Sequence, residues 1–167
     1  MNMNTIRFST VDTPFGKMGI AVSSKGLCRI LFPEEIPFGP ALKKDFPKES
    51  IIKDDKACKD IRKQIQEYFS GKRTDFELVL DIHTSPFYKK ALKAVYSVPF
   101  GKTASYKEIA EKAGNPKAVR AAGSANANNP IPIVIPCHRV INTNGGLGGY
   151  GGNLQRKGFL LEMEGSL

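Results

Sequence analysis

The segment from Asn129 to Arg139 constrains the fold of this chain more than any other stretch. It reads Asn-Pro-Ile-Pro-Ile-Val-Ile-Pro-Cys-His-Arg, so three prolines fall within seven residues. Proline has no backbone N–H and a fixed φ, which excludes a regular helix and a fully hydrogen-bonded central strand here. Because the other residues are mostly apolar, we expect a rigid, irregular and buried segment that presents Cys137 and His138 side by side.

A cysteine next to a histidine suggests a reactive thiol. The thiolate is the nucleophilic form, and a free thiol has a pKa of about 8.5, so reaction near neutral pH requires a nearby base or cation. Adjacent side chains usually diverge, so Cys137 and His138 need a bend in the backbone to act together. A merely structural buried cysteine is the alternative, but the rigid frame and the glycine-rich run over 145–152 favour a reactive thiol.

Metal and phosphate sites find little support in the sequence. The three cysteines (Cys28, Cys58 and Cys137) cannot form a closed set of disulfides, and no C-x-x-C or H-x-x-x-H spacing occurs, so we expect no metal site. The glycine-rich run lacks the Gly-Lys-Ser/Thr ending of a phosphate-binding P-loop.

The positive charge of the chain is concentrated in its second half. Residues 1–83 hold 14 basic and 12 acidic side chains, a net +2, whereas residues 84–167 hold 11 basic and 4 acidic ones, a net +7. A basic half is typical of proteins that meet a polyanion such as nucleic acid, although solubility alone also explains basic surfaces. The sequence contains no apolar run near the length of a membrane span and no apolar signal core at its start, so we expect neither membrane insertion nor export.

The front half reads as a small α+β unit. Apolar, strand-like segments separated by turn residues occupy 6–11, 17–22 and 27–32, and a further strand is possible over 76–80. Four prolines and a glycine make 33–49 an expected irregular connection. Apolar residues at intervals of three or four predict a helix from Cys58 to Ser70.

The back half reads as mostly helical. Ser85-Pro86 predicts the start of a helix that buries Phe87, Leu92, Val95 and Tyr96. Ser105 and Glu108 form a capping-box pattern at the start of a short helix that ends near residue 113. A third helix over 117–128 follows a tight Gly-Asn-Pro turn, and the two together predict a helix-turn-helix. We place the domain boundary between 1–83 and 84–167.

Pro136-Cys137-His138-Arg139-Val140 resembles the active-site signature of the O6-alkylguanine-DNA alkyltransferases, the methylated-DNA–protein-cysteine methyltransferases. The resemblance covers about residues 85–165, and the front half is similar only loosely. Further motifs at family spacing are Pro99-Phe100-Gly101, Ser105-Tyr106, Gly114-Asn115-Pro116, Arg120-Ala121-Ala122-Gly123, Asn129-Pro130, the glycine-rich loop, Leu160-Leu161 and Glu164-Gly165.

The resemblance implies an α+β fold, with a small RNase H-like sheet-plus-helix domain followed by a mostly helical, winged-helix-like domain. It implies a DNA repair protein that flips O6-alkylguanine, and also O4-alkylthymine, out of the duplex and transfers the alkyl group irreversibly to its own cysteine. No cofactor is needed, because the protein is the acceptor. The expected partner is double-stranded DNA bound through the minor groove by a monomer, in the cytoplasm of a prokaryote or the nucleus of a eukaryote.

The resemblance also implies a role for each residue at a motif position. Cys137 is the nucleophile, and His138 removes its proton through a bound water. Glu164 orients His138, and Asn129 holds the active-site turn. Arg120 fills the hole left by the flipped base, and Tyr106 presses on the target phosphate. Small residues let the third helix enter the minor groove: Ala121, Ala122, Gly123, Ser124, Ala125 and Ala127. The expected pocket comprises Tyr106, Pro132, Val140, Tyr150, Gly151 and Gly152, and the expected phosphate contacts are Lys89, Lys90, Lys102, Lys107 and Lys117.

The sequence departs from the family pattern in places. The family usually shows Tyr-x-Gly-Gly, but here Tyr150-Gly151-Gly152 is followed by Asn153, and Gly151 stands where a serine is common. These changes leave the width of the pocket open, and with it the tolerance for larger alkyl groups. Arg-Ala-Val-Gly reads Arg-Ala-Ala-Gly, and Cys28, Cys58 and His83 do not complete a zinc set like that of some members.

Two alternatives belong to other functional classes. The first is a non-catalytic damage-binding protein of the same fold, but that group lacks the cysteine in its signature, so Cys137 argues against it. The second is a cysteine hydrolase that uses Cys137 and His138, but the sequence offers no obvious oxyanion hole.

Overall fold

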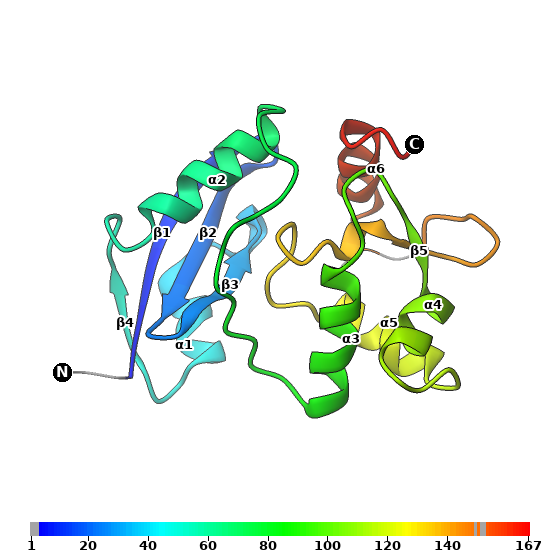
Figure 1. Ribbon diagram of the computed structural model, residues 1–167. Coiled ribbons are helices and arrows are strands. Elements are labelled where there is room, and N and C mark those ends of the chain that lie inside the picture. The colour runs from blue at the N-terminus through cyan, green and yellow to red at the C-terminus, as the bar shows by residue number, and fades with distance from the viewer. Residues whose placement is uncertain (1–3, 149, 151–152) are drawn as a thin grey trace. The chain divides into compact units, whose positions relative to one another are not determined.

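The computed structural model describes residues 4–148, 150 and 153–167, which form two compact units, Met1–Ile82 and His83–Leu167 (Figure 1). The division falls one residue before the boundary expected from the sequence. The first unit is built on a four-stranded sheet and the second is mostly helical. The expected α+β class, with a sheet domain before a helical domain, is confirmed.

The sheet of the first unit comprises β1 (Thr5–Thr13), β2 (Gly16–Ser23), β3 (Gly26–Leu31) and β4 (Ser50–Lys53), in the order β3-β2-β1-β4. β1, β2 and β3 form an antiparallel meander, as their short connections predict, whereas β4 pairs with β1 in parallel. The sequence did not indicate β4, because its four residues are too few to show alternation and are mostly exposed.

The expectation of an irregular connection over 33–49 is wrong. Residues 33–35 form a 3₁₀ turn, η1 (Pro33–Glu35), and residues 38–45 form α1 (Phe38–Asp45). The prolines do not prevent this. Pro33, Pro37 and Pro40 lie before or within the first turn of a helix, where a backbone N–H would lack an intrahelical partner anyway, and Pro47 follows the end of α1. Phe38 and Leu42 of α1 pack on the sheet in a core cluster with residues such as Ile6.

The helix predicted over 58–70 is present as α2 (Lys59–Phe69), which lies against β1 (Figure 1). It buries the predicted stripe, including Ile61, Ile65 and Tyr68. The possible strand over 76–80 is not formed. That stretch makes only an isolated bridge between Leu80 and Leu27, since the Leu27 N–H donates to the Val79 oxygen at 2.9 Å.

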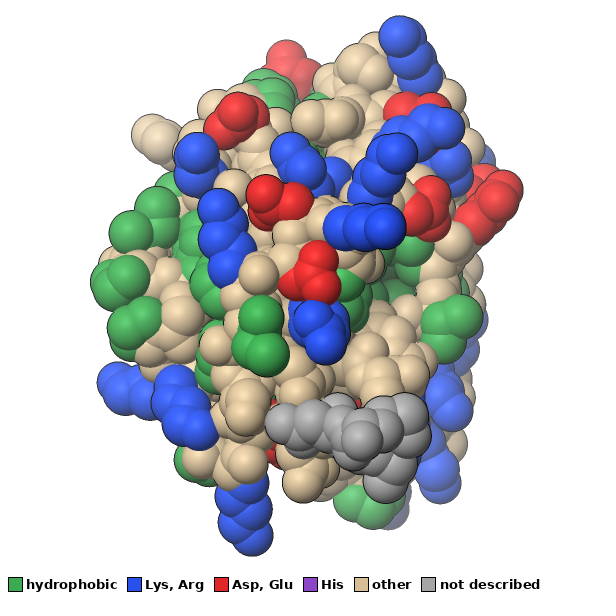
Figure 2. All heavy atoms as spheres, turned by 90° about the vertical axis from the view of Figure 1, so that its left-hand side faces the viewer, with side chains coloured by type: hydrophobic (Ala, Val, Ile, Leu, Met, Phe, Trp, Pro, Cys, Tyr) green, Lys and Arg blue, Asp and Glu red, His purple; other side chains and the backbone are tan. Residues whose placement is uncertain are grey.

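The near-neutral charge of the first unit is arranged as mixed charges and ion pairs. On the face shown in Figure 2, basic and acidic side chains are interspersed. Arg29 binds both Glu35 at 2.8 Å and Asp45 at 3.0 Å, and Arg7 binds Asp54 at 2.8 Å. Most of the uncompensated positive charge, +7 of the net +9, therefore belongs to the second unit.

The second unit contains the helices α3 (Pro86–Tyr96), α4 (Tyr106–Lys112), α5 (Val119–Ala127) and α6 (Leu154–Met163). A 3₁₀ turn, η2 (Cys137–Arg139), precedes β6 (Val140–Ile141), which pairs in parallel with β5 (Ala104–Ser105). α3 begins where predicted, α4 and α5 match their predicted bounds within two residues at each end, and α4 and α5 pack together as the expected helix pair. The sequence did not predict α6 or the two short strands.

The ends of the helices follow the predicted signals only in part. The Glu108 N–H donates to the Ser105 hydroxyl at 3.1 Å, so Ser105 caps α4 as expected. Ser85 stands at the start of α3 but makes no side-chain capping bond. The prediction that Tyr96 is buried is wrong: 40% of it is exposed, because the residue lies in the last turn of α3 after the buried Leu92 and Val95.

No helix among the described residues combines the length and the apolar character needed to cross a membrane.

The role of α1 in the core can be tested with Leu42→Ala. Leu42 is fully buried in the cluster between α1 and the sheet, so its truncation should lower the free energy of unfolding by about 2–5 kcal/mol. Urea denaturation followed by circular dichroism measures this loss. Lys44→Ala, at an exposed position of the same helix, should change stability by less than about 0.5 kcal/mol. Equal effects of the two substitutions would contradict the packing described for α1.

Candidate functional site

The proline-rich segment is rigid, irregular and buried, as its sequence predicts. All of the residues from Ile131 to Val140 are buried. Ile133 adopts a φ of 74°, a left-handed conformation that is unfavourable for a β-branched residue and costs about 1–3 kcal/mol. Asn129 holds the segment from both sides, since its Nδ2 donates to the Ile135 oxygen at 2.8 Å and its Oδ1 accepts from the Ile131 N–H at 2.9 Å.

Cys137 begins η2 and is buried, with 5% of its surface exposed. Burial raises the pKa of its thiol to about 11, because an apolar environment disfavours the thiolate. Hydrogen bonds from Asn129 and Tyr150 and the positive charge of Lys157 act in the opposite direction and favour the thiolate. At neutral pH the resting site therefore contains a thiol, surrounded by groups that stabilise the anion once a base removes its proton.

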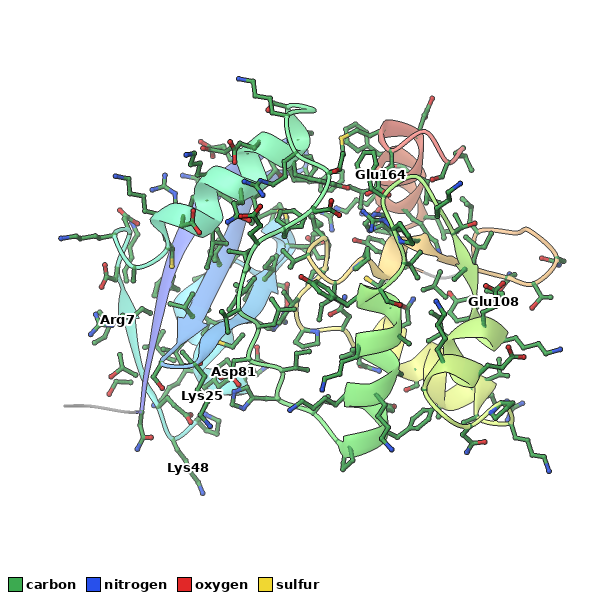
Figure 3. All side chains as sticks on the ribbon, viewed as in Figure 1. Arg7, Lys25, Lys48, Asp81, Glu108 and Glu164 are labelled. Atoms are coloured by element: carbon green, nitrogen blue, oxygen red, sulfur yellow. The ribbon has the colours of Figure 1, made fainter. Side chains whose placement is uncertain are left out.

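The neighbouring histidine is part of a buried network of charged side chains. The Nε2 atom of His138 lies 2.8 Å from Oε2 of Glu164, and neither side chain is exposed. Arg139 binds the same carboxylate through two nitrogens, Nε to Oε1 at 2.8 Å and a terminal nitrogen to Oε2 at 3.0 Å, and also donates to the Val98 oxygen at 2.7 Å. Figure 3 shows Glu164 at the end of α6, with side-chain nitrogen atoms beside it.

These contacts define the protonation state of His138. Burial lowers the pKa of its imidazole below 6.5 and outweighs Glu164, which acts to raise it. The ring is therefore neutral at neutral pH. Because the Glu164 carboxylate accepts hydrogen bonds, Nε2 carries the proton and Nδ1 keeps a free lone pair. Nδ1 is buried and has no hydrogen-bond partner among the described residues, which leaves it available as a base next to Cys137.

Lys157 is a functional residue that the sequence reasoning missed. Its side chain is fully buried, its Nζ donates to the Val140 oxygen at 2.6 Å, and the same atom lies 6.0 Å from the centre of the Tyr106 ring. Burial lowers the pKa of its ammonium group to about 8. A signal for it exists in the sequence, because Lys157 falls on the same helical stripe as Leu160, Leu161 and Glu164.

Arg139 was also missed, although it lies within the cysteine motif. A charged residue in a sequence is usually solvated, so its bidentate contact with a buried carboxylate could be recognised only after the burial of both groups was known.

The residues predicted to enter the minor groove lie on and before α5. The other predicted phosphate contacts are exposed on other elements: Lys89 and Lys90 on α3, Lys102 before β5 and Lys107 on α4. Arg120, Lys117 and Ala127 are exposed, and Ala121, Gly123 and Ser124 are partly exposed. Ala122 and Ala125 differ, because both are fully buried and pack inside the unit; their side chains cannot form part of the predicted surface. The Ser124 hydroxyl is hydrogen-bonded to that of Tyr88 in α3.

Tyr106 lies between α5 and the glycine-rich loop. A Cβ atom on Gly123 would meet its ring at 3.7 Å, an ordinary contact, whereas one on Gly148 would lie 2.8 Å from its hydroxyl oxygen. Gly148 also has a φ of 71°, so its conformation favours glycine, and a larger residue there would have to displace the Tyr106 hydroxyl.

Of the other predicted pocket residues, Tyr150 interacts with the thiol, and two more lie in the same buried segment as Cys137. Pro132 and Val140 are buried in the segment that carries Cys137, and the Tyr150 ring meets the His138 ring edge-on with their centres 6.5 Å apart. Gly151 and Gly152 lie outside the described residues.

The cysteines of the first unit differ from Cys137. Cys28 and Cys58 are buried and free, and burial raises their pKa values to about 12 and about 11. Over 4–148, 150 and 153–167, no three or more His, Cys, Asp or Glu side chains are grouped so as to hold a metal ion.

Comparisons with known proteins cover both units. Residues 6–82 match the ribonuclease-like domain of 6-O-methylguanine DNA methyltransferase, and residues 86–166 match its DNA-binding domain. The methylated-DNA–protein-cysteine methyltransferase of Mycobacterium tuberculosis is 38% identical over 159 residues, which is 95% of this chain and 92% of that protein. The constitutive enzyme of that name from Bacillus subtilis is 37% identical over 160 residues, 94% of each chain.

Solved structures agree with the sequence comparisons. The crystal structure of Mycobacterium tuberculosis OGT in complex with DNA superimposes with a TM-score of 0.83 at 37% identity, covering 96% of this chain and 93% of that one. The O6-methylguanine-DNA methyltransferase of Pyrococcus kodakaraensis gives a TM-score of 0.64 at 26% identity, over 96% and 99% of the two chains. With both domain types matched in order and relatives this similar over nearly their full length, the chain belongs to the 6-O-methylguanine DNA methyltransferase family.

Proposed function

We propose that this protein repairs DNA by transferring an alkyl group from O6 of guanine to the sulfur of its own Cys137. The observation that carries the proposal is the buried Cys137–His138–Glu164 arrangement, in which Nε2 of His138 is bound to the carboxylate and Nδ1 is left as a base. Relatives named methylated-DNA–protein-cysteine methyltransferase support the same reaction.

The first step is removal of the thiol proton. Neutral His138 takes it, directly or through one water, and becomes an imidazolium ion that the Glu164 carboxylate stabilises. Arg139 holds that carboxylate in place with two hydrogen bonds, so it cannot turn away from the imidazole. Lys157, Asn129 and Tyr150 favour the thiolate that forms.

The second step is an in-line displacement at the alkyl carbon. A lone pair of the Cys137 sulfur forms the new carbon–sulfur bond, the carbon–O6 bond breaks, and its electron pair leaves on the guanine. The guanine then takes up one proton, so the net reaction exchanges the alkyl group for the proton of the thiol. The product is a thioether, which has no proton to lose and cannot act again. Each protein molecule therefore reacts once, and no cofactor enters the balance.

Access to a buried sulfur requires the base to leave the helical stack, which costs a few kcal/mol. Arg120 is exposed near the start of α5 and is the proposed replacement for the flipped base. Gly123 and Ala127 give α5 a surface with small side chains that suits the narrow minor groove, and Tyr106 is the proposed contact to the target phosphate. The net +7 of residues 84–167 supplies attraction to phosphates that does not depend on sequence. We expect a monomer to bind one site, and O4-alkylthymine to be a second substrate.

A non-catalytic damage-binding role and a cysteine hydrolase are the competing functions. Cys137 argues against the first, because a pure binding protein has no need of a nucleophile beside a base. The hydrolase would release its product and turn over, whereas the alkyl acceptor would not. Intact mass after reaction separates all three.

Methyl transfer to Cys137 can be tested by incubating the protein with a duplex that contains O6-methylguanine. We expect a gain of one methyl group per chain, located on Cys137, with no further turnover. Cys137→Ser should gain nothing, whereas Cys28→Ser and Cys58→Ser should react as the unmodified protein does, because their thiols lie in the other unit. Tight binding without a change in mass would favour the damage-binding role, and repeated turnover the hydrolase.

The pH dependence of transfer should report the titration of His138. The neutral imidazole is the base, and burial holds its pKa below 6.5, so the transfer rate should fall only at pH values below 6.5, as the imidazole takes up a proton. Between about pH 6.5 and 7.5 the rate should be nearly flat, because the pKa of the thiol, raised to about 11, lies above this range. At higher pH the rate should decline, because Lys157, whose pKa burial lowers to about 8, loses the charge that favours the thiolate. Reaction with O6-benzylguanine, followed by mass spectrometry, avoids effects of pH on DNA binding. A tenfold rise per pH unit across the neutral range would show that His138 is not the base.

Arg120→Ala separates base flipping from chemistry. The substitution should slow repair of duplex DNA about 10- to 100-fold, the range for a loss of 1.4–2.7 kcal/mol, which is part of the cost of extrusion. It should leave reaction with free O6-benzylguanine unchanged, because that substrate needs no flipping. Equal losses on the two substrates would rule out the proposed role of Arg120.

A further inference from the structure

Asn126 joins the DNA-facing helix to the residue that carries the reactive thiol. It lies near the end of α5 and is 95% buried. Its Nδ2 donates a hydrogen bond to the backbone oxygen of Cys137 at 3.2 Å. A carbonyl oxygen can only accept, so the amide nitrogen must face it. The same oxygen also accepts from the Val140 N–H, which closes the η2 turn.

The Asn126 amide is an unusual group to bury at this place. Its Oδ1 is shielded from solvent and has no hydrogen-bond partner among the described residues. An unpaired buried acceptor is unfavourable, and an apolar side chain of similar size would fill the space without that cost. Simple packing therefore does not explain the asparagine, whereas its donor bond to Cys137 does.

The bond connects two parts of the site that have separate tasks. Arg120 lies near the beginning of α5, and Asn126 lies on the buried side of the same helix, less than two turns further on. Asn129 already fixes the strained segment before Cys137, but its backbone contacts are with Ile131 and Ile135, and its hydrogen bond to Cys137 is with the thiol. The Asn126 bond is thus a direct hydrogen bond from α5 itself to the nucleophilic residue.

We propose that Asn126 is a positioning residue for alkyl transfer. It fixes the position of the Cys137 backbone relative to α5, the helix whose Arg120 helps to extrude the target base. This inference rests on the proposed function, because it concerns where the sulfur stands when an alkylated base arrives. Without the bond, the η2 turn and α5 can shift independently. A base that Arg120 helps to extrude then meets a sulfur displaced from the line of attack, and small displacements of this kind slow reactions strongly.

Asn126→Leu tests the proposal, since leucine has a similar size but no donor. At saturating substrate, the rate constant for transfer from O6-benzylguanine should fall about tenfold, the effect expected for one lost hydrogen bond. The transfer rate constant on an O6-methylguanine duplex should fall several times more, because a base flipped from the duplex reaches the sulfur only when α5 and Cys137 keep their relative position. The affinity for undamaged duplex should stay unchanged, since the exposed face of α5 is intact.

The double variant Asn126→Leu/Arg120→Ala isolates the coupling. If Asn126 acts by fixing the position of Cys137 relative to α5, the additional loss of transfer rate that Asn126→Leu causes on duplex DNA should disappear once Arg120 is absent. An extra loss that persists without Arg120, or equal losses on the two substrates, would overturn the coupling. An unchanged rate with both substrates would overturn the positioning role altogether.

Asn128→Leu is the matched control. Asn128 is exposed at the end of the same helix, and its amide donates to the Ser124 oxygen at 2.8 Å within that helix end. Its substitution should change neither rate. A loss as large as that of Asn126→Leu would show that any change at this helix end slows transfer, and would overturn the proposal.

A measurement on the unmodified protein covers the case in which Asn126→Leu does not fold. With ¹⁵N-labelled asparagine, the side-chain amide protons of Asn126 should exchange with solvent at least tenfold more slowly than those of Asn128. Equal exchange would mean that the bond to Cys137 is absent in solution, which overturns the inference. The unmodified protein must also gain its methyl group; a failure there would contradict the proposed function, independently of the exchange result.

Discussion

The Glu164 carboxylate, bound at once to His138 and Arg139, is the interaction on which the rest of the site depends. A carboxylate without exposed surface is strongly unfavourable unless it is paired and fully hydrogen-bonded. Arg139 supplies the compensating charge through a two-point contact, and its third nitrogen donates to the Val98 oxygen after α3. One buried charge pair therefore ties together η2, α6 and the residues that follow α3. Because Arg139 balances the carboxylate, His138 can stay neutral and serve as a base.

The thiol owes its position to a backbone that has little freedom. Prolines, the left-handed conformation of Ile133 and the two bonds of the Asn129 side chain define the path of the chain up to Cys137. A strained residue persists only where its surroundings hold it in place, and such strain is common at functional sites. The burial of the whole segment offsets the conformational strain of Ile133. The position of the Cys137 sulfur is therefore fixed before any substrate binds.

Much of the fold and of the site was predictable from sequence, for reasons that differ between elements. α2, α3 and α4 carry apolar stripes or start signals, α5 follows a tight Gly-Asn-Pro turn, and the prolines around Cys137 constrain the backbone directly. α1 was missed because its prolines look like helix breakers until their places in the first turn are known, and β4 because it is too short to show a pattern. Arg139 and Lys157 were missed for another reason. A charged side chain indicates a surface unless its burial is known, and burial depends on contacts between residues far apart in the sequence.

The order of the residues along the chain has a consequence for biosynthesis. Glu164 follows His138 by 26 residues and comes from the turn after α6, so a nascent chain contains the nucleophile well before the acid that orients its base. Until α6 folds onto η2, the imidazole has no carboxylate to stabilise its cation, and Lys157 has not entered the interior. The site thus becomes competent only when the domain is complete. A protein whose thiol reacts only once gains from this arrangement, because the thiol of a chain that is still incomplete is less reactive than that of the folded domain.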